Sequence, residues 1–186
     1  MSRFSLSALP LAGLMVVERH PLSDSRGFLA RLFCAEELTA AGWNQPIVQI
    51  NHTYTAKSGT VRGLHFQRPP HAEMKLLSCL HGEVWDVVVD LRADSPTFLQ
   101  WHAERLSAAN GRALLIPEGF AHGFQALSDD VELLYCHSAA YAAEAEAGLH
   151  PLDPWLDIRW PLETVQMSPR DASHPLIESG FEGVCL

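Results

Sequence analysis

Val61-Arg62-Gly63-Leu64-His65-Phe66-Gln67 is the stretch around which the rest of the chain is organised, and its pattern is that of a β-strand. Side chains of a strand alternate between its two faces. His65 is therefore predicted to share a face with Gly63, whereas Arg62, Leu64 and Phe66 lie on the other face. A histidine in such apolar company is predicted to point into an enclosed space.

Strand-like runs recur along the chain at spacings of roughly 8–12 residues, which is typical of antiparallel sandwiches and barrels. The predicted strands cover residues 14–17, 29–33, 47–51, 61–67, 74–80, 83–91, 98–105, 113–116, 121–127 and 131–137. Between two of them, His81-Gly82 is typical of a tight hairpin turn. Residues 35–42 predict a short helix with Gly42 as its C-cap.

These strands predict one all-β domain over residues 1–186, folded as an antiparallel jelly roll with a few short helices. Beyond Tyr141, short polar and aromatic turns replace the strands. The C-terminal part is therefore expected to wrap around the barrel or cap it. Unpaired edge strands favour a homodimer.

The composition is that of an ordinary globular protein, with 47% hydrophobic and 19% charged residues. A formal net charge of −9 argues against a nucleic-acid partner, because phosphate backbones are bound by basic surfaces. A small anionic ligand is not excluded, since a few arginines inside a pocket act locally. No apolar run can span a bilayer, no signal peptide is recognisable, and the four cysteines form no CxxC pair, so we expect a cytoplasmic protein with reduced thiols.

His65 carries the side chain best suited to a general base at neutral pH, since an unperturbed imidazole has a pKa of about 6.5. A carboxylate bonded to one of its nitrogens would fix the tautomer and stabilise the imidazolium. Asp171, in a proline-containing turn, and Asp86, in a strand of valines, are the candidates for this role. From the pattern alone, His65 could instead be a core histidine without a catalytic role, and both aspartates could serve only as structural hydrogen-bond partners.

Further polar residues could surround a ligand. The ammonium of Lys75, a mid-strand residue, could face the oxyanion that forms when a carbonyl compound loses its α-proton. Tyr135 and Tyr141 could donate a proton to a bound ring or stack on it. Arg26 and Arg62 carry the forked guanidinium that suits phosphate or carboxylate. The alternatives are that the lysine extends its ammonium to solvent, that the tyrosines are ordinary strand aromatics, and that the arginines form surface ion pairs.

A metal site is the competing interpretation of the histidines. His71, Glu73 and His122, together with His65, offer nitrogen and oxygen ligands that suit zinc or iron. No HxH pair is present. Our main prediction is therefore a site without metal.

In their order along the chain, the motifs resemble those of the dTDP-4-dehydrorhamnose 3,5-epimerase family. The matching segments are SRGF (25–28), QINH (49–52), VRGLHFQ (61–67), KL (75–76), GEVWDV (82–87), VDLR (89–92), SPTF (95–98), IPEGFAHGF (116–124), Tyr135, Tyr141, DP (153–154), IRWP (158–161) and SPRD (168–171). They cover nearly the whole chain, and RGLHFQ with IPEGFAHGF is a specific pair.

The resemblance implies a metal-free, cupin-like jelly roll that dimerises and epimerises a nucleotide-linked 4-keto-6-deoxy sugar. It casts His65 as the base oriented by Asp171, Tyr135 as the acid on the opposite face of the sugar, and Lys75 as the cation that steadies the enolate. The matching substrate-binding positions are Arg26, Gln49, Asn51, Arg62, His122 and Glu146, to which we add Tyr141 and Arg170. No cofactor is implied, because the C4 carbonyl accepts the electrons.

Three departures from the family pattern leave this catalytic set intact. Arg31 stands where the family usually has a glutamate at the nucleotide end, and Arg170 stands where it usually has a lysine. The tryptophan that commonly precedes the Asp153-Pro154 dipeptide is also missing. The alternative functions are a single-position epimerase, a metal-dependent cupin dioxygenase or isomerase, and a non-catalytic module that binds nucleotide sugars.

Overall fold

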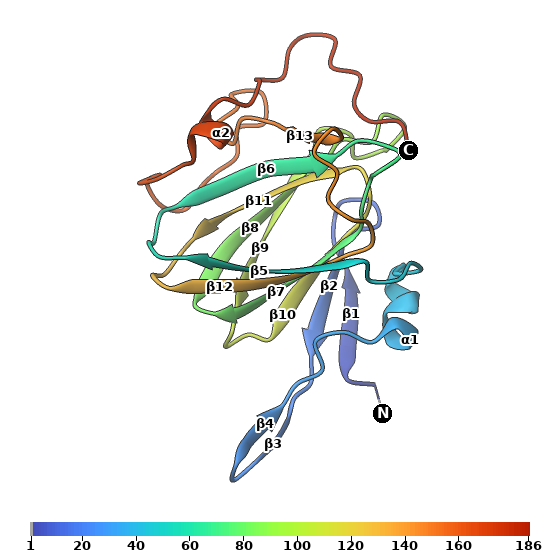
Figure 1. The fold of residues 1–186 in the computed structure, drawn as a ribbon, viewed down its shortest axis with the longest axis vertical. Helices are drawn as coiled ribbons and strands as arrows, with labels where there is room; N and C mark the ends of the chain where they lie inside the picture. The colour runs from blue at the N-terminus through green and yellow to red at the C-terminus, as the bar shows by residue number, and fades with distance from the viewer. Residues whose placement is uncertain (1) are drawn as a thin grey trace.

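A computed structural model describes residues 2–186 and confirms the all-β prediction, with two antiparallel sheets facing one another as a jelly roll (Figure 1). The six-stranded sheet has the order β1 (Phe4–Ala8), β2 (Met15–Arg19), β10 (Arg112–Ile116), β7 (Lys75–His81), β12 (Val131–His137) and β5 (Gln49–Thr55). The five-stranded sheet has the order β13 (Glu146–Gly148), β6 (Val61–Gln67), β11 (Phe120–Ala126), β8 (Glu83–Asp90) and β9 (Trp101–Ser107).

The shorter elements lie outside these sheets. β3 (Leu22–Asp24) and β4 (Gly27–Leu29) form a hairpin that projects away from the body at the bottom of Figure 1. α1 (Ala35–Leu38) continues into a 3₁₀ turn, η1 (Thr39–Ala41). That turn ends at Gly42 with φ +96°, which confirms the predicted glycine C-cap.

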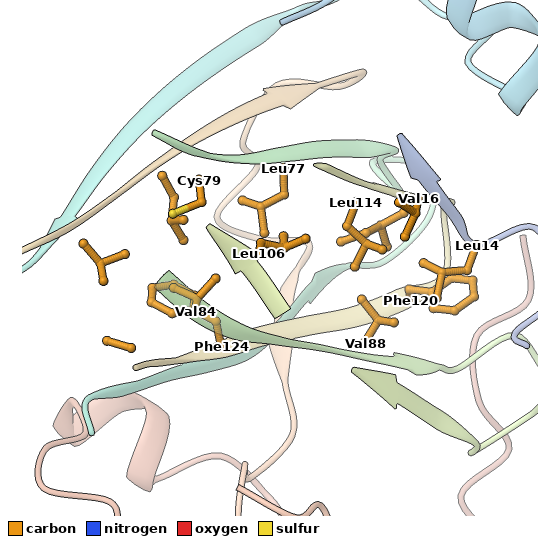
Figure 2. Packing of buried hydrophobic residues seen from close by; sticks show 14 of the residues in the cluster. Leu14, Val16, Leu77, Cys79, Val84, Val88, Leu106, Leu114, Phe120 and Phe124 are labelled. Atoms are coloured by element: carbon orange, nitrogen blue, oxygen red, sulfur yellow. The ribbon is translucent and has the colours of Figure 1, made fainter. Parts of the chain in front are cut away.

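The main hydrophobic core fills the space between the two sheets (Figure 2). Leu77 and Leu114 enter it from the six-stranded sheet, and Val88 and Leu106 enter it from the five-stranded sheet. All four side chains are fully buried. Each contributes roughly 1.5–3 kcal/mol of burial free energy, so this layer holds the sheets together and fixes the walls of the site.

The predicted hairpin at His81-Gly82 is wrong, because β7 and β8 belong to different sheets. β7 pairs with β10 and β12, whereas β8 pairs with β9 and β11. At the corner, Gly82 has φ +73°, and a Cβ there would lie 2.6 Å from Oγ of Ser128. A glycine turn therefore marks a sharp change of direction here, and the long-range pairing decides that the chain crosses between sheets.

The predicted strand at 29–33 is also wrong. β4 ends at Leu29, and the following residues run without strand pairing toward α1. The ring of Phe33 instead packs edge-on against Trp43, with the ring centroids 5.3 Å apart. The strands predicted at 47–51 and 98–105 are present but begin later, at Gln49 and Trp101.

β6 has the predicted bounds, but a bulge changes which of its side chains share a face. His65 pairs with His122, while Arg62 pairs with Phe124, so three steps along β6 oppose two steps along β11. The extra residue places Arg62 and His65 on the same cavity, against our prediction of opposite faces. The bulge is possible because a Cβ on Gly63 would lie 2.5 Å from Cα of Gly123.

The C-terminal part wraps over β6, as predicted. β13 pairs with one edge of β6, and the N–H of Val61 donates to the carbonyl of Gln166. The short helix α2 (Pro169–Ala172) begins after Ser168, whose Oγ accepts a hydrogen bond of 3.0 Å from the N–H of Asp171. This cap holds Asp171 beside β6. Among the described residues, no helix is long and apolar enough to cross a membrane.

Candidate active site

One cavity of about 650 Å³ lies between the sheets, with walls from β5, β6, β7, β11 and β12 and from the tail around α2. Most of the residues predicted for the site line it. They are His65, Lys75, Tyr135, Asp171, Asn51, Arg62, His122, Tyr141, Glu146 and Arg170. Residues from both sheets and from the C-terminal tail thus meet around one cavity.

His65 and Asp171, 106 residues apart, form a hydrogen-bonded pair with 2.8 Å between Nε2 and Oδ1. The other oxygen of Asp171 accepts from the N–H of Gly63 at 3.2 Å. Burial raises the pKa of Asp171, but the hydrogen bond and charge of His65 outweigh burial and bring that pKa down to about 2. An ionised Asp171 holds the proton of His65 on Nε2 and leaves Nδ1 as the basic nitrogen.

Asp86, the other candidate partner for His65, pairs with a different histidine. Its carboxylate lies 2.9 Å from Nε2 of His122, and both side chains are buried. Burial raises the pKa of Asp86, and the charge of His122 opposes that rise. The two carboxylates therefore each orient one histidine on neighbouring strands of the same sheet.

Tyr135 reaches the cavity from β12, in the sheet that faces His65. Its ring stacks on His137 at 5.9 Å and meets the ring of His122 edge-on at 5.9 Å. Burial first, and then the charge of Asp86, raises the pKa of Tyr135. The phenol therefore keeps its proton at neutral pH and can act as an acid.

Lys75 lies in a compact buried cluster that the sequence did not predict as such. Its Nζ is 3.1 Å from Glu73, and the amide of Gln67 donates to the same carboxylate at 3.1 Å. Nδ1 of His137 lies 3.3 Å from Glu73 without hydrogen-bond alignment. Burial raises the pKa of Glu73, but His137 and Lys75 outweigh it and the net shift is downward. His137 lies two residues beyond Tyr135 on one strand face, a period-two signal that could have found it.

A second group of predicted residues is linked at the rim of the cavity. The hydroxyl of Tyr141 donates to Glu146 at 2.9 Å, and Arg170 bonds the other oxygen of Glu146 at 2.9 Å. Nη2 of Arg170 lies 3.2 Å from Nε2 of His65. The departure from lysine at this position therefore places a guanidinium directly beside the base.

Of the residues singled out from the sequence, those that do not line the cavity are Asp86, His71, Arg26, Gln49 and Arg31. Arg26, on the β3–β4 hairpin, has a side chain that is 87% exposed and paired with Asp24. Gln49 donates to Asn51 at 3.0 Å and accepts from the N–H of Tyr141, so it supports two residues that do line the cavity. Arg31 forms an ion pair with Glu37.

The fold does not bring together the four residues that the metal interpretation proposed as ligands, His65, His71, Glu73 and His122. Each of these residues has a separate partner, with His71 nearest Glu144, Glu73 against Lys75, and His122 against Asp86. Within residues 2–186, His65 and these three form no common group with metal-ligand spacing.

Comparison with known proteins gives a consistent family. Residues 8–179 match the family model described as dTDP-4-dehydrorhamnose 3,5-epimerase. A dTDP-4-dehydrorhamnose 3,5-epimerase of Pseudomonas aeruginosa is 43% identical over 156 residues, 83% of this chain and 85% of that protein. A dTDP-4-dehydrorhamnose 3-epimerase of Streptomyces niveus is 38% identical over 167 residues, 89% of this chain and 80% of that protein.

Solved structures agree. The dTDP-6-deoxy-D-glucose-3,5-epimerase of Legionella pneumophila, in complex with dTDP-4-keto-L-rhamnose, superimposes with a TM-score of 0.91 at 38% identity. The match covers 98% of both chains. The cupin-like jelly roll and the predicted resemblance are thereby confirmed.

Proposed function

The chain belongs to the dTDP-4-dehydrorhamnose 3,5-epimerase family, and from this premise we propose that it inverts C3 and C5 of a dTDP-linked 4-keto-6-deoxyhexose. The observation that carries the proposal is a single cavity in which the His65–Asp171 pair, from one sheet and the tail, faces Tyr135 from the other sheet. Epimerisation needs a base and an acid on opposite faces of one carbon, and this arrangement supplies them.

The substrate's own ketone makes the reaction feasible. A carbonyl at C4 acidifies the hydrogens on C3 and C5, because the carbanion left by either proton is delocalised as an enolate. Nδ1 of His65 takes the proton, and Asp171 stabilises the resulting imidazolium. Tyr135 then gives a proton to the same carbon from the other face. The electrons return from the oxygen to carbon, so the reaction is redox-neutral.

Lys75 supplies the positive charge for the enolate oxygen in this proposal. Its ammonium is buried and held by Glu73 at 3.1 Å, so it is oriented before the substrate arrives. Glu73 also offsets part of the lysine's charge. Nδ1 of His137 lies 3.3 Å from the same carboxylate, so Glu73 contacts both side chains.

The nucleotide-sugar substrate is anionic, and the cavity offers cations for its diphosphate despite the acidic chain. Arg62 lines the wall next to His65, and Arg170 lies at the rim. We assign Asn51, His122, Tyr141 and Glu146 to the hydroxyl and ring contacts, because each lines the same space. The Legionella relative, which holds dTDP-4-keto-L-rhamnose, supports this substrate class.

A homodimer is the second part of the proposal. On the β3–β4 hairpin, Phe28 is 75% exposed and Leu29 is 70% exposed, an unfavourable arrangement for a monomer in water. In a dimer this hairpin would cover apolar surface and carry Arg26 toward the partner's cavity. Light scattering of the wild type and Phe28→Asp tests the dimer. The wild type should have twice the mass of one chain, and the mass of the variant should fall toward that of one chain.

Solvent exchange tests the activity. In D₂O with dTDP-4-keto-6-deoxyglucose, NMR should show deuterium at C3 and at C5. Exchange at neither carbon would sink the proposal, and binding of dTDP without exchange would favour a non-catalytic module. The cytoplasmic location, the single functional domain and the lack of a nucleic-acid partner stay predictions from the sequence.

Epimerisation at C3 alone is the second candidate, and the Streptomyces niveus relative favours it. Its 38% identity is close to the 43% of the double epimerase from Pseudomonas aeruginosa, so similarity alone does not separate the two activities. Deuterium at C3 without deuterium at C5 would establish the single-position activity.

A further inference from the structure

His174 is a partly buried histidine that the proposed reaction does not use. It follows α2, and its side chain is only 14% exposed. Its Nε2 is buried without a hydrogen-bond partner among the described residues. A buried polar atom left without a partner costs about 1–3 kcal/mol, so this nitrogen calls for an explanation.

The imidazole ring of His174 occupies space that is free because residue 148 is a glycine. A Cβ on Gly148 would lie 2.4 Å from the imidazole of His174. Gly148 pairs with His65 across β13 and β6, so the glycine opens the space directly beside the proposed base. His174 is thus seated against the catalytic pair, with its ring 5.6 Å from that of His65 at an interplanar angle of 71°.

The unpartnered nitrogen faces a carboxylate and another imidazole nitrogen. Nε2 of His174 lies 3.9 Å from Oδ1 of Asp171, and the same oxygen is 2.8 Å from Nε2 of His65. All three atoms lie within 4.8 Å of one another. Ligand atoms about 2.0–2.2 Å from a tetrahedral zinc ion are roughly 3.3–3.6 Å apart, so small side-chain rotations would bring these three to that spacing.

We propose that His65, Asp171 and His174 form an inhibitory site for a divalent transition metal ion, with zinc as the best fit. Two imidazole nitrogens and one carboxylate oxygen suit zinc and cobalt, whereas magnesium and calcium prefer oxygen ligands. Three protein ligands would leave a fourth position for water.

Inhibition follows from the tautomer. A neutral imidazole that binds a metal through Nε2 carries its proton on Nδ1. Nδ1 is the nitrogen left to act as the base when Asp171 holds Nε2, so a bound ion converts it into a donor. The ion also takes the carboxylate that stabilises the imidazolium. This consequence rests on the proposed function, whereas the binding of the ion does not.

Arg170 opposes the ion, and Glu146 offers a way to relieve that opposition. The guanidinium lies 3.2 Å from Nε2 of His65 and 3.6 Å from Oδ1 of Asp171, where it would repel a cation. It is already bonded to Glu146 at 2.9 Å and its side chain is half-exposed, so it can rotate away. Removing the guanidinium should therefore strengthen metal binding.

Cobalt titration tests the site without reference to turnover. The background replaces Cys34 and Cys185, which lie at least partly at the surface, by serine, so that thiols do not compete. Co²⁺ should bind at one equivalent with the visible bands of a four-coordinate site, and Zn²⁺ should displace it. His174→Gln should weaken both ions about ten-fold or more, and Arg170→Gln should tighten them.

Epimerase assays complete the test. Without metal, His174→Gln should turn over like the parent, because His174 has no role in the proposed reaction; with zinc, the parent should lose activity and the variant should resist. Equal cobalt affinity in parent and variant, equal zinc inhibition in both, or no cobalt spectrum at millimolar cobalt would each overturn the site. If the metal-free parent has no activity, the proposed function fails while the cobalt result still decides the site.

Discussion

The two walls of the cavity hold their charged groups in different ways. On the five-stranded sheet, His65 has one carboxylate partner, which is brought from 106 residues away by a capped helical turn. On the six-stranded sheet, Lys75 shares Glu73 with His137, all within or next to two adjacent strands. The first arrangement fixes one proton on one nitrogen, whereas the second distributes charge among several groups. We therefore expect the largest loss of activity from substitution of His65 on the first wall, and smaller losses from substitutions on the second wall.

Loss of the base should have the largest effect. His65→Ala removes the group that takes the C3 and C5 protons, so kcat should fall about 10²–10⁴-fold, the usual contribution of a general base. A coupled assay of epimerised product, with circular dichroism as the check on folding, measures it. A folded variant with near-wild-type kcat would exclude His65 as the base.

Loss of the acid should separate two steps that loss of the base removes together. Tyr135→Phe keeps His65 and Lys75, so abstraction and exchange continue, while protonation from the other face is slowed about 10²-fold or more. The ratio of solvent deuterium incorporated to product formed should rise. An unchanged ratio would mean that another group, such as His122, delivers the proton.

The second wall is probed by the pair Lys75→Met and Glu73→Gln. Removing the ammonium should lower kcat about 10²–10³-fold, the range for loss of one oxyanion-stabilising donor. Glu73→Gln retains the ammonium and removes the charge that offsets it, so kcat should change less than ten-fold and its pH profile should shift. Steady-state kinetics over a pH series compares them. Equal losses in both variants would mean that Glu73 is as indispensable as the lysine.

The smallest effect concerns stability. Asp171 has a pKa of about 2 in the folded chain, below its ordinary value of 3.8, so its ionised form favours the folded state. That contribution, at most about 2 kcal/mol, is fully present above about pH 4 and is lost as the pH falls toward 2. Urea unfolding of the wild type and Asp171→Asn should show a stability gap that narrows below pH 4. A gap that stays constant over that range would contradict the low pKa.

Features decided by the local sequence could be predicted, whereas features that depend on contacts between distant residues could not. β6 and β12 have the predicted bounds because their apolar patterns are decided locally. The corner at Gly82 differs from the predicted hairpin because a glycine turn has the same local signal whether the next strand pairs with the preceding one or crosses to the facing sheet. Arg62 was assigned to the wrong face because a bulge depends on Gly63 meeting Gly123, a contact between distant residues.

The site shows the same limit. The sequence offers both Asp171 and Asp86 as partners of His65, and only the fold assigns one carboxylate to each histidine. The sequence presents Glu73 as a possible metal ligand and not as the partner of Lys75, since the turn that places it beside the lysine has no sequence signature. His174 gave no signal, because its position depends on Gly148 in a strand paired with β6.

Exchange followed by NMR in D₂O, with the wild type and His65→Ala side by side, tests the central claim most directly. The account predicts deuterium at C3 and C5 of dTDP-4-keto-6-deoxyglucose with the wild type, and exchange about 10²–10⁴-fold slower at both carbons with His65→Ala. Exchange by the variant at the wild-type rate, or none by the wild type, would contradict it.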